Sequence, residues 1–174
     1  MDEKTFIDAD RLPVLIGKDG ETKRLLEQHF DSTMAIDSQS AEIVISGKDA
    51  VSTFTLKNVI SAINFGHNPK KALKLEDEHM VLDVIDVKSM VKDAGRCKVI
   101  MGRIIGKEGS TRKVIEEASG CDVSVKDHYV SVIGPYENTL IVHDALKMLI
   151  SGAAHKSFYA FLEKNAVRKD PAIL

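Results

Sequence analysis

The chain has 174 residues, of which 44% are hydrophobic and 29% charged, and its formal net charge is −2. This is the composition of a folded globular protein, so it excludes a collagen-like chain, a disulfide-stapled chain and wholesale disorder. The near-neutral charge and an aromatic content of 5%, with no tryptophan, argue against a basic nucleic-acid binder that stacks bases on aromatic rings. The sequence has neither an apolar run of about 18 residues nor a signal or transit pattern, so we expect a cytoplasmic protein.

The first half of the chain predicts a strand, two helices joined by a glycine loop, two further strands and a closing helix. The strand begins near Thr5, and the first helix covers residues 11–16, with Pro13 at its start, where proline is tolerated. The loop Gly17-Lys18-Asp19-Gly20 leads into the second helix. The closing segment, residues 48–65, is amphipathic and therefore predicts a helix that packs on one side.

The second half predicts the same order of elements. β-Branched residues indicate its first strand, Gly120 is a natural end for its second helix, and Gly134-Pro135 is expected to break the chain before the closing helix. The expected elements are strand 80–87, helix 96–105, loop 106–109, helix 110–119, strands 121–126 and 129–133, and helix 136–151. The residues assigned to the apolar faces of these helices are Val99, Ile100, Ile104 and Ile105, then Val114, Ile115 and Ala118, then Leu140, Ile141, Ala145, Met148 and Leu149.

The two halves are copies of one unit. LIGKDGETKRLLE at residues 15–27 and IIGKEGSTRKVIE at residues 104–116 match position by position. A polar patch at residues 74–78 separates the copies, so we expect two domains, 1–78 and 79–174. The first carries a short helical tail and the second a C-terminal helix, and the last residues, 168–174, are expected to fray.

Each loop has two glycines three positions apart, between two helices. Such a turn lets the backbone approach a ligand closely, and the N-terminus of the following helix presents N–H groups and the positive end of its dipole. Phosphate is the natural partner, and bases would lie in an aliphatic groove between the second helix and the strand that follows it. The candidate RNA-binding residues are Gly17, Lys18, Asp19, Gly20 and Lys23 in the first unit, and Arg103, Gly106, Lys107, Glu108, Gly109, Arg112 and Lys113 in the second.

The charge is distributed unevenly between the two units. Residues 1–78 carry a net charge of −4 and residues 79–174 a net charge of +2. Residues 96–113 contain six basic side chains and one acid, whereas residues 10–24 contain four basic side chains and three acids. The near-neutral total is therefore an average over an acidic unit and a local basic site, and the second loop is expected to bind anions better.

IIGKEGSTRKVIEEASG, followed by two strands and a helix, resembles a type I KH domain, and the chain resembles two of them in tandem. Most KH domains have an aliphatic residue three positions after the second glycine, where this chain has Lys23 and Arg112. That departure, the GRIIGKEGSTRK stretch and the helical extension at 155–168 are similar to small-ribosomal-subunit assembly factors of the partner-of-Nob-one type, also called Dim-two. The intact loop at 17–20 favours their archaeal form.

The resemblance implies an α+β fold of two β-α-α-β-β-α units, each with a three-stranded antiparallel sheet packed against helices. It implies binding of single-stranded RNA near the 3′ end of small-subunit ribosomal RNA during its maturation. We expect neither catalysis nor a cofactor, because the sequence has no nucleotide-binding or metal-binding motif. The partners it implies are a PIN-domain rRNA endonuclease and either an rRNA dimethyladenosine transferase or the alpha subunit of initiation factor two.

Other classes of function are disfavoured or remain open. The stretch 102–108 is not a Walker A loop, because it has three residues between its glycines and a glutamate where serine or threonine must hold magnesium. The two cysteines, Cys97 and Cys121, predict reduced core thiols, and the six histidines lack metal-ligand spacing and are expected at the surface or half-buried. A protein-interaction scaffold and a general single-stranded RNA-binding regulator remain alternatives.

Overall fold

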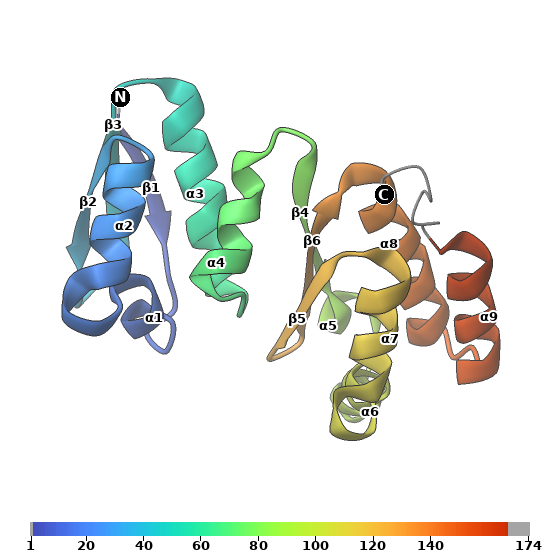
Figure 1. Ribbon diagram of the computed structural model, residues 1–174. Helices are drawn as coiled ribbons and strands as arrows, with labels where there is room; N and C mark the ends of the chain where they lie inside the picture. The colour runs from blue at the N-terminus through green and yellow to red at the C-terminus, as the bar shows by residue number, and fades with distance from the viewer. Residues whose placement is uncertain (1, 167–174) are drawn as a thin grey trace, which may run out of the picture. The chain divides into compact units, whose positions relative to one another are not determined.

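The computed structural model describes residues 2–166, which divide into two compact units between Glu78 and His79. The segment expected to fray, 168–174, lies outside the described residues. Each unit has one three-stranded antiparallel sheet, with β1-β3-β2 as the strand order in the first and β4-β6-β5 in the second (Figure 1). No helix among the described residues is long and apolar enough to cross a membrane.

The first unit follows the predicted order. Its main elements are β1 (Asp2–Phe6), α1 (Leu12–Ile16), α2 (Glu21–His29), β2 (Ser32–Asp37), β3 (Glu42–Gly47) and α3 (Ala50–Asn64). A 3-10 turn, η1 (Lys18–Gly20), forms the loop between α1 and α2, and a short tail of α4 (Pro69–Ala72) and η2 (Leu73–Glu76) closes the unit. The N–H of Ser52 donates to the carboxylate of Asp49, which caps α3 and holds the pKa of Asp49 below its usual range.

The second unit repeats this order and adds two helices. Its elements are β4 (Met80–Asp86), α5 (Val87–Met90), α6 (Ala94–Ile105), η3 (Lys107–Gly109), α7 (Ser110–Ser119), β5 (Asp122–Lys126), β6 (Tyr129–Pro135), α8 (Tyr136–Ile150) and α9 (His155–Asn165). The short helix α5 was not expected, whereas α9 confirms the C-terminal helix. The predicted α+β fold of two β-α-α-β-β-α units is therefore confirmed.

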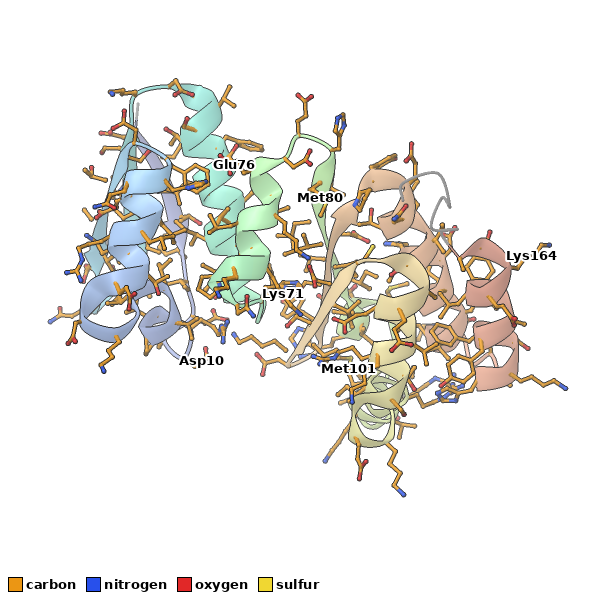
Figure 2. The ribbon with its side chains drawn as sticks, viewed as in Figure 1. Asp10, Lys71, Glu76, Met80, Met101 and Lys164 are labelled. Atoms are coloured by element: carbon orange, nitrogen blue, oxygen red, sulfur yellow. The ribbon has the colours of Figure 1, made fainter. Side chains whose placement is uncertain are left out.

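The core of the second unit lies between its sheet and its helices. Alternate residues of β6, Val130 and Val132, face this core, since neighbouring side chains of a strand point to opposite faces. Met101, labelled in Figure 2, belongs to the buried stripe of α6. The predicted core position of both thiols is confirmed: Cys97 and Cys121 are buried. Further members of this core are Ile100, Ile104, Ile115, Val123, Val142, Leu146, Leu149, Phe158 and Leu162.

Some of the predicted helix faces are wrong at their edges. Val99 is 64% exposed, Ile105 38% and Leu140 46%, although each was assigned to an apolar face. The buried stripe of α6 keeps Ile100 and Ile104 from the predicted face and adds Cys97 and Met101. The 3.6-residue period identifies a helix, but several neighbouring stripes fit an apolar-rich sequence, and packing against the sheet selects one of them.

The predicted break at Gly134-Pro135 is also wrong. Both residues belong to β6, where Pro135 pairs with Met80, and α8 begins at the next residue. A Cβ at Gly134 would lie 3.1 Å from the Cβ of Cys121 and nearer still to its Sγ. The glycine is therefore required by its close contact with Cys121, directly before the neighbouring strand β5, rather than by a turn.

Candidate nucleic-acid interface

The first glycine of each loop adopts a backbone conformation that is open only to glycine. Gly17 has φ 74° and ψ 177°, and Gly106 has φ 74° and ψ 171°. A Cβ at Gly106 would lie 2.6 Å from the backbone nitrogen of Thr111, and one at Gly17 would lie 2.8 Å from that of Thr22. The turn therefore brings the preceding helix tightly against the start of the next, which fixes the position of the loop.

The second glycine of each loop has space around it. Gly20 and Gly109 are left-handed, with φ of 77° and 73°, and each precedes the first residue of a helix. No heavy atom beyond its chain neighbours lies within 4 Å of a Cβ built on Gly109. A ligand can therefore approach the backbone closely at the N-terminus of α7.

The residue before the second glycine is also left-handed but carries a side chain. Asp19 has φ 52° and Glu108 has φ 55°. Such a conformation is uncommon for residues other than glycine, and strain of this kind concentrates at binding sites. Lys18 and Lys107, which precede these residues, are exposed. The side chains that extend from the loop end of α6 and α7 include long ones with nitrogen at their tips (Figure 2).

The two loops differ in how far their positive charge is neutralised. In the first unit, Lys23 Nζ lies 2.9 Å from Glu27 Oε1, and the N–H of Met34 also donates to Glu27, at 2.7 Å. Burial raises the pKa of Glu27, but these two hydrogen bonds outweigh it and hold the pKa of the carboxyl below its usual range. The pair cancels much of the charge that Lys23 brings to the first loop.

In the second unit, Arg112 occupies the position of Lys23 and Glu116 that of Glu27. Glu116 accepts a hydrogen bond from the N–H of Val123, at 2.9 Å, which joins α7 to β5. Within residues 2–166, however, no carboxylate pairs with Arg112, Lys107 or Lys113, and the Nε of Arg112 is buried without a hydrogen-bond partner. The two loops thus differ at one aligned cation, since Lys23 is paired with a carboxylate and Arg112 is not. The aliphatic groove beside the second loop stays a prediction.

Arg103 has a structural role. Its guanidinium donates to the carbonyls of Leu149 and Ala153, where α8 ends. Arg11 does the same in the first unit, with Nε 2.7 Å from the carbonyl of Ile63 and a terminal nitrogen 3.0 Å from that of His67. Both arginines satisfy carbonyls at the end of a closing helix. Contact of Arg103 with RNA stays a prediction.

His67 corrects the expectation for the histidines, because it is buried, at 3% exposure. Its backbone N–H donates to the carbonyl of Ala62. Three others pair with single carboxylates: His29 with Glu76, His128 with Asp86, and His143 with Asp83. In the described part of the chain, no three histidine, cysteine or acidic side chains lie close enough to hold a metal ion.

Two residues of α9 lie beside the second loop and were not predicted there. His155 and Tyr159 help to line a cavity of about 450 Å³ together with Gly106 and Lys107. Their sequence gives no sign of this position, because they reach the loop only through the packing of α9 on α7 and α8. Figure 1 shows α9, in red, beside α8.

A β-α-α-β-β-α unit with a GxxG loop between its first two helices is a type I KH domain, and two such units in tandem define the class of this protein. A sequence model of the second KH domain of PNO1, described as "Eukaryotic type KH-domain (KH-domain type I)", matches residues 81–167. The KH domain-containing protein MJ0443 of Methanocaldococcus jannaschii is 36% identical over 162 residues, which cover 91% of this chain and 71% of that protein.

Two further similarities extend the comparison. The pre-rRNA-processing protein pno1 of Emericella nidulans is 32% identical over 124 residues, 70% of this chain but only 45% of the relative. The crystal structure of an a/eIF2alpha–aDim2p–rRNA complex from Pyrococcus horikoshii matches with a TM-score of 0.88 at 33% identity, covering 94% of this chain and 93% of the other. The chain belongs to the Dim2p/PNO1 family of KH-domain proteins, non-catalytic RNA-binding factors of pre-rRNA processing.

Proposed function

We propose that this protein binds single-stranded RNA near the 3′ end of small-subunit ribosomal RNA through its GxxG loops and assists its maturation. The observation that carries the proposal is the second loop, where an open, left-handed glycine and three unpaired cationic side chains surround one helix N-terminus. These residues are Gly109, Lys107, Arg112 and Lys113. The relative that was crystallised with rRNA supports the choice of ligand.

The geometry suits a phosphate backbone rather than a base. The N-terminus of α7 supplies backbone N–H groups and the positive end of a helix dipole, and Gly109 leaves its surface clear. A GxxG loop clamps about four nucleotides in this way. The first loop has the same backbone, but Glu27 neutralises Lys23, so we expect it to bind more weakly.

The proposed protein partners follow from family relationships. The crystallised relative is in a complex with a/eIF2alpha, so the alpha subunit of initiation factor two is the partner with most support. The PIN-domain endonuclease and the dimethyladenosine transferase are proposed on the resemblance alone.

Reversal of the loop charges tests the proposal. In the second loop, Lys107→Asp combined with Glu108→Asp places a negative charge where a phosphate would bind, and we expect RNA affinity to fall by about tenfold to a hundredfold. In the first loop, Lys18→Asp gives the same sequence, Gly-Asp-Asp-Gly, and a smaller loss is expected. Fluorescence anisotropy with a labelled 12-nucleotide RNA of the 3′-terminal small-subunit sequence measures both.

Lys164→Asp is the matched control. Lys164 is exposed near the end of α9 that lies away from the loop (Figure 2), so the same change in charge should alter affinity by less than about twofold. Full affinity in both loop variants would refute the loop mechanism. A parent protein that binds no RNA would favour the scaffold.

A further inference from the structure

Two aromatic rings stand beside the second loop. His155 and Tyr159, one helical turn apart on α9, have ring centroids 5.9 Å apart, and both side chains are half-buried. They border the cavity of about 450 Å³ whose other walls include Gly106, Lys107 and Ser110. The cavity is shallow and open to solvent, so it can receive a flat ring at the surface rather than enclose a whole small molecule.

The loop region itself holds both rings in place. The Nε2 of His155 lies 3.2 Å from the carbonyl oxygen of Arg103, in the last turn before the loop. The hydroxyl of Tyr159 lies 3.4 Å from Thr111 Oγ1, at the start of α7. The rings are therefore pre-positioned relative to the phosphate-binding backbone, which lowers the entropic cost of using them.

The cavity lies outside the predicted groove. Glu116 joins α7 to β5, whereas Val114 and Ala118 line a hollow against α9. Residues two positions apart on a helix project about 200° apart, so α9 packs on the side of α7 opposite to β5. A ligand in the cavity and a base in the groove would therefore occupy different sides of the same loop.

The first unit lacks these rings. Gly66 and Gly152 follow the closing helices of the two units with similar φ, 104° and 100°. They are therefore equivalent positions, from which the segments that follow can be compared. Three and seven positions further on, the first unit has Pro69 and Leu73 where the second has His155 and Tyr159. The two rings are thus found only beside the second loop, where, among the described residues, Arg112 has no carboxylate partner such as Lys23 has in the first.

We propose that this cavity binds one base of the RNA strand whose phosphates the second loop holds, stacked against Tyr159 and His155. The inference rests on the proposed function, since it needs RNA at the loop. Lys107 lies at the boundary between the loop and the cavity, so its ammonium can bind the phosphate of the stacked nucleotide. Stacking on an aromatic side chain contributes about 1–3 kcal/mol per base, which corresponds to roughly fivefold to 150-fold in affinity.

Substitution of Tyr159 in the full chain tests the inference. Tyr159→Leu inserts the residue that the first unit has at this position, and we expect it to weaken binding of the 12-nucleotide RNA by at least about fivefold. Tyr159→Phe keeps the ring and should bind within about twofold of the parent. Because no phosphate contact is lost, the slope of log affinity against log salt should be the same in all three proteins.

Each other outcome counts against the inference in a distinct way. Equal binding by the parent and Tyr159→Leu would show that the cavity is not used, with the proposed function intact. Equal weakening in both variants, or a smaller salt slope in Tyr159→Leu, would mean that Tyr159 only supports the loop. A parent that binds no RNA would remove the proposed function itself.

A measurement on the unaltered protein avoids any effect on folding. RNA that carries 4-thiouridine should crosslink on irradiation to the peptide that contains His155 and Tyr159. Crosslinks confined to other peptides would overturn the inference even if Tyr159→Leu failed to fold.

Discussion

Gly106→Ala is expected to destabilise the second unit by about 3 kcal/mol and to weaken RNA binding by at least about tenfold. The new Cβ would lie 2.6 Å from the backbone nitrogen of Thr111 and nearer still to its Oγ1. The backbone conformation at φ 74° and ψ 171° is also unfavourable for alanine. Residue 106 must therefore change its backbone angles, and the loop must change shape with it. Urea denaturation gives the free energy of unfolding, and anisotropy gives the affinity.

Gly109→Ala is the matched control, three residues away in the same loop. Its φ of 73° is also left-handed, but a Cβ there meets no heavy atom within 4 Å. The free energy of unfolding should therefore fall by only about 1 kcal/mol, the cost of holding alanine in a left-handed conformation. Equal destabilisation by the two substitutions would contradict the account of Gly106, because steric contact would then contribute nothing.

Phe158→Ala is expected to lower the free energy of unfolding of the second unit by about 3–5 kcal/mol. Phe158 has no exposed surface and lies in the core where α9 packs on the rest of the unit. Phe158 and Leu162 are the buried residues of α9, so loss of the ring removes a large part of the packing that holds the helix. It should therefore also displace Tyr159 and lower RNA affinity to the level of Tyr159→Leu.

Phe161→Ala makes the same change on the same helix at a partly buried position. It should cost clearly less, about 1–2 kcal/mol, and leave α9 docked. If the two phenylalanines cost the same, or if Phe158→Ala kept full stability, then α9 would not be held by its buried face.

The order of elements and both loops could be predicted because their signals are local. A glycine at positive φ is required where α6 meets α7 and again where α1 meets α2, and the same spacing occurs in both copies. The repeat strengthened each signal, since a chance GxxG would not be followed in both places by the same strands and closing helix. The division of charge between the units was likewise a property of the sequence alone.

Side-chain roles that depend on tertiary packing could not be predicted. Arg103 is predicted to contact RNA because it lies one turn before the loop, and that prediction remains. The sequence does not show, however, that its guanidinium donates to carbonyls at the end of α8, 46 and 50 residues away. Arg11 plays the same part in the first unit from a position that does not align with Arg103 in the repeat. In each copy an arginine donates to carbonyls at the end of the closing helix, but the two arginines stand at different positions of the repeat. Alignment of the repeats therefore does not show that they have the same role.

The low aromatic content led to the expectation that base stacking has no part in binding. The aromatic content is an average over the whole chain. It does not describe the surface near the second loop, where α9 brings two rings to one cavity. Val99, which is 64% exposed, also lines this cavity. Residues that looked like core or tail in the sequence belong to the neighbourhood of the loop in the fold.

The salt dependence of RNA binding tests the central claim, that the GxxG loops hold the phosphate backbone, most directly. Anisotropy titrations of the parent protein with the 12-nucleotide 3′-terminal RNA, at several concentrations of potassium chloride, give the slope of log affinity against log salt. If about four phosphates are neutralised, the slope should be about −3, and it should become less steep when Lys107 and Glu108 are both replaced by aspartate. A slope near zero, or one unchanged by those substitutions, would contradict the account.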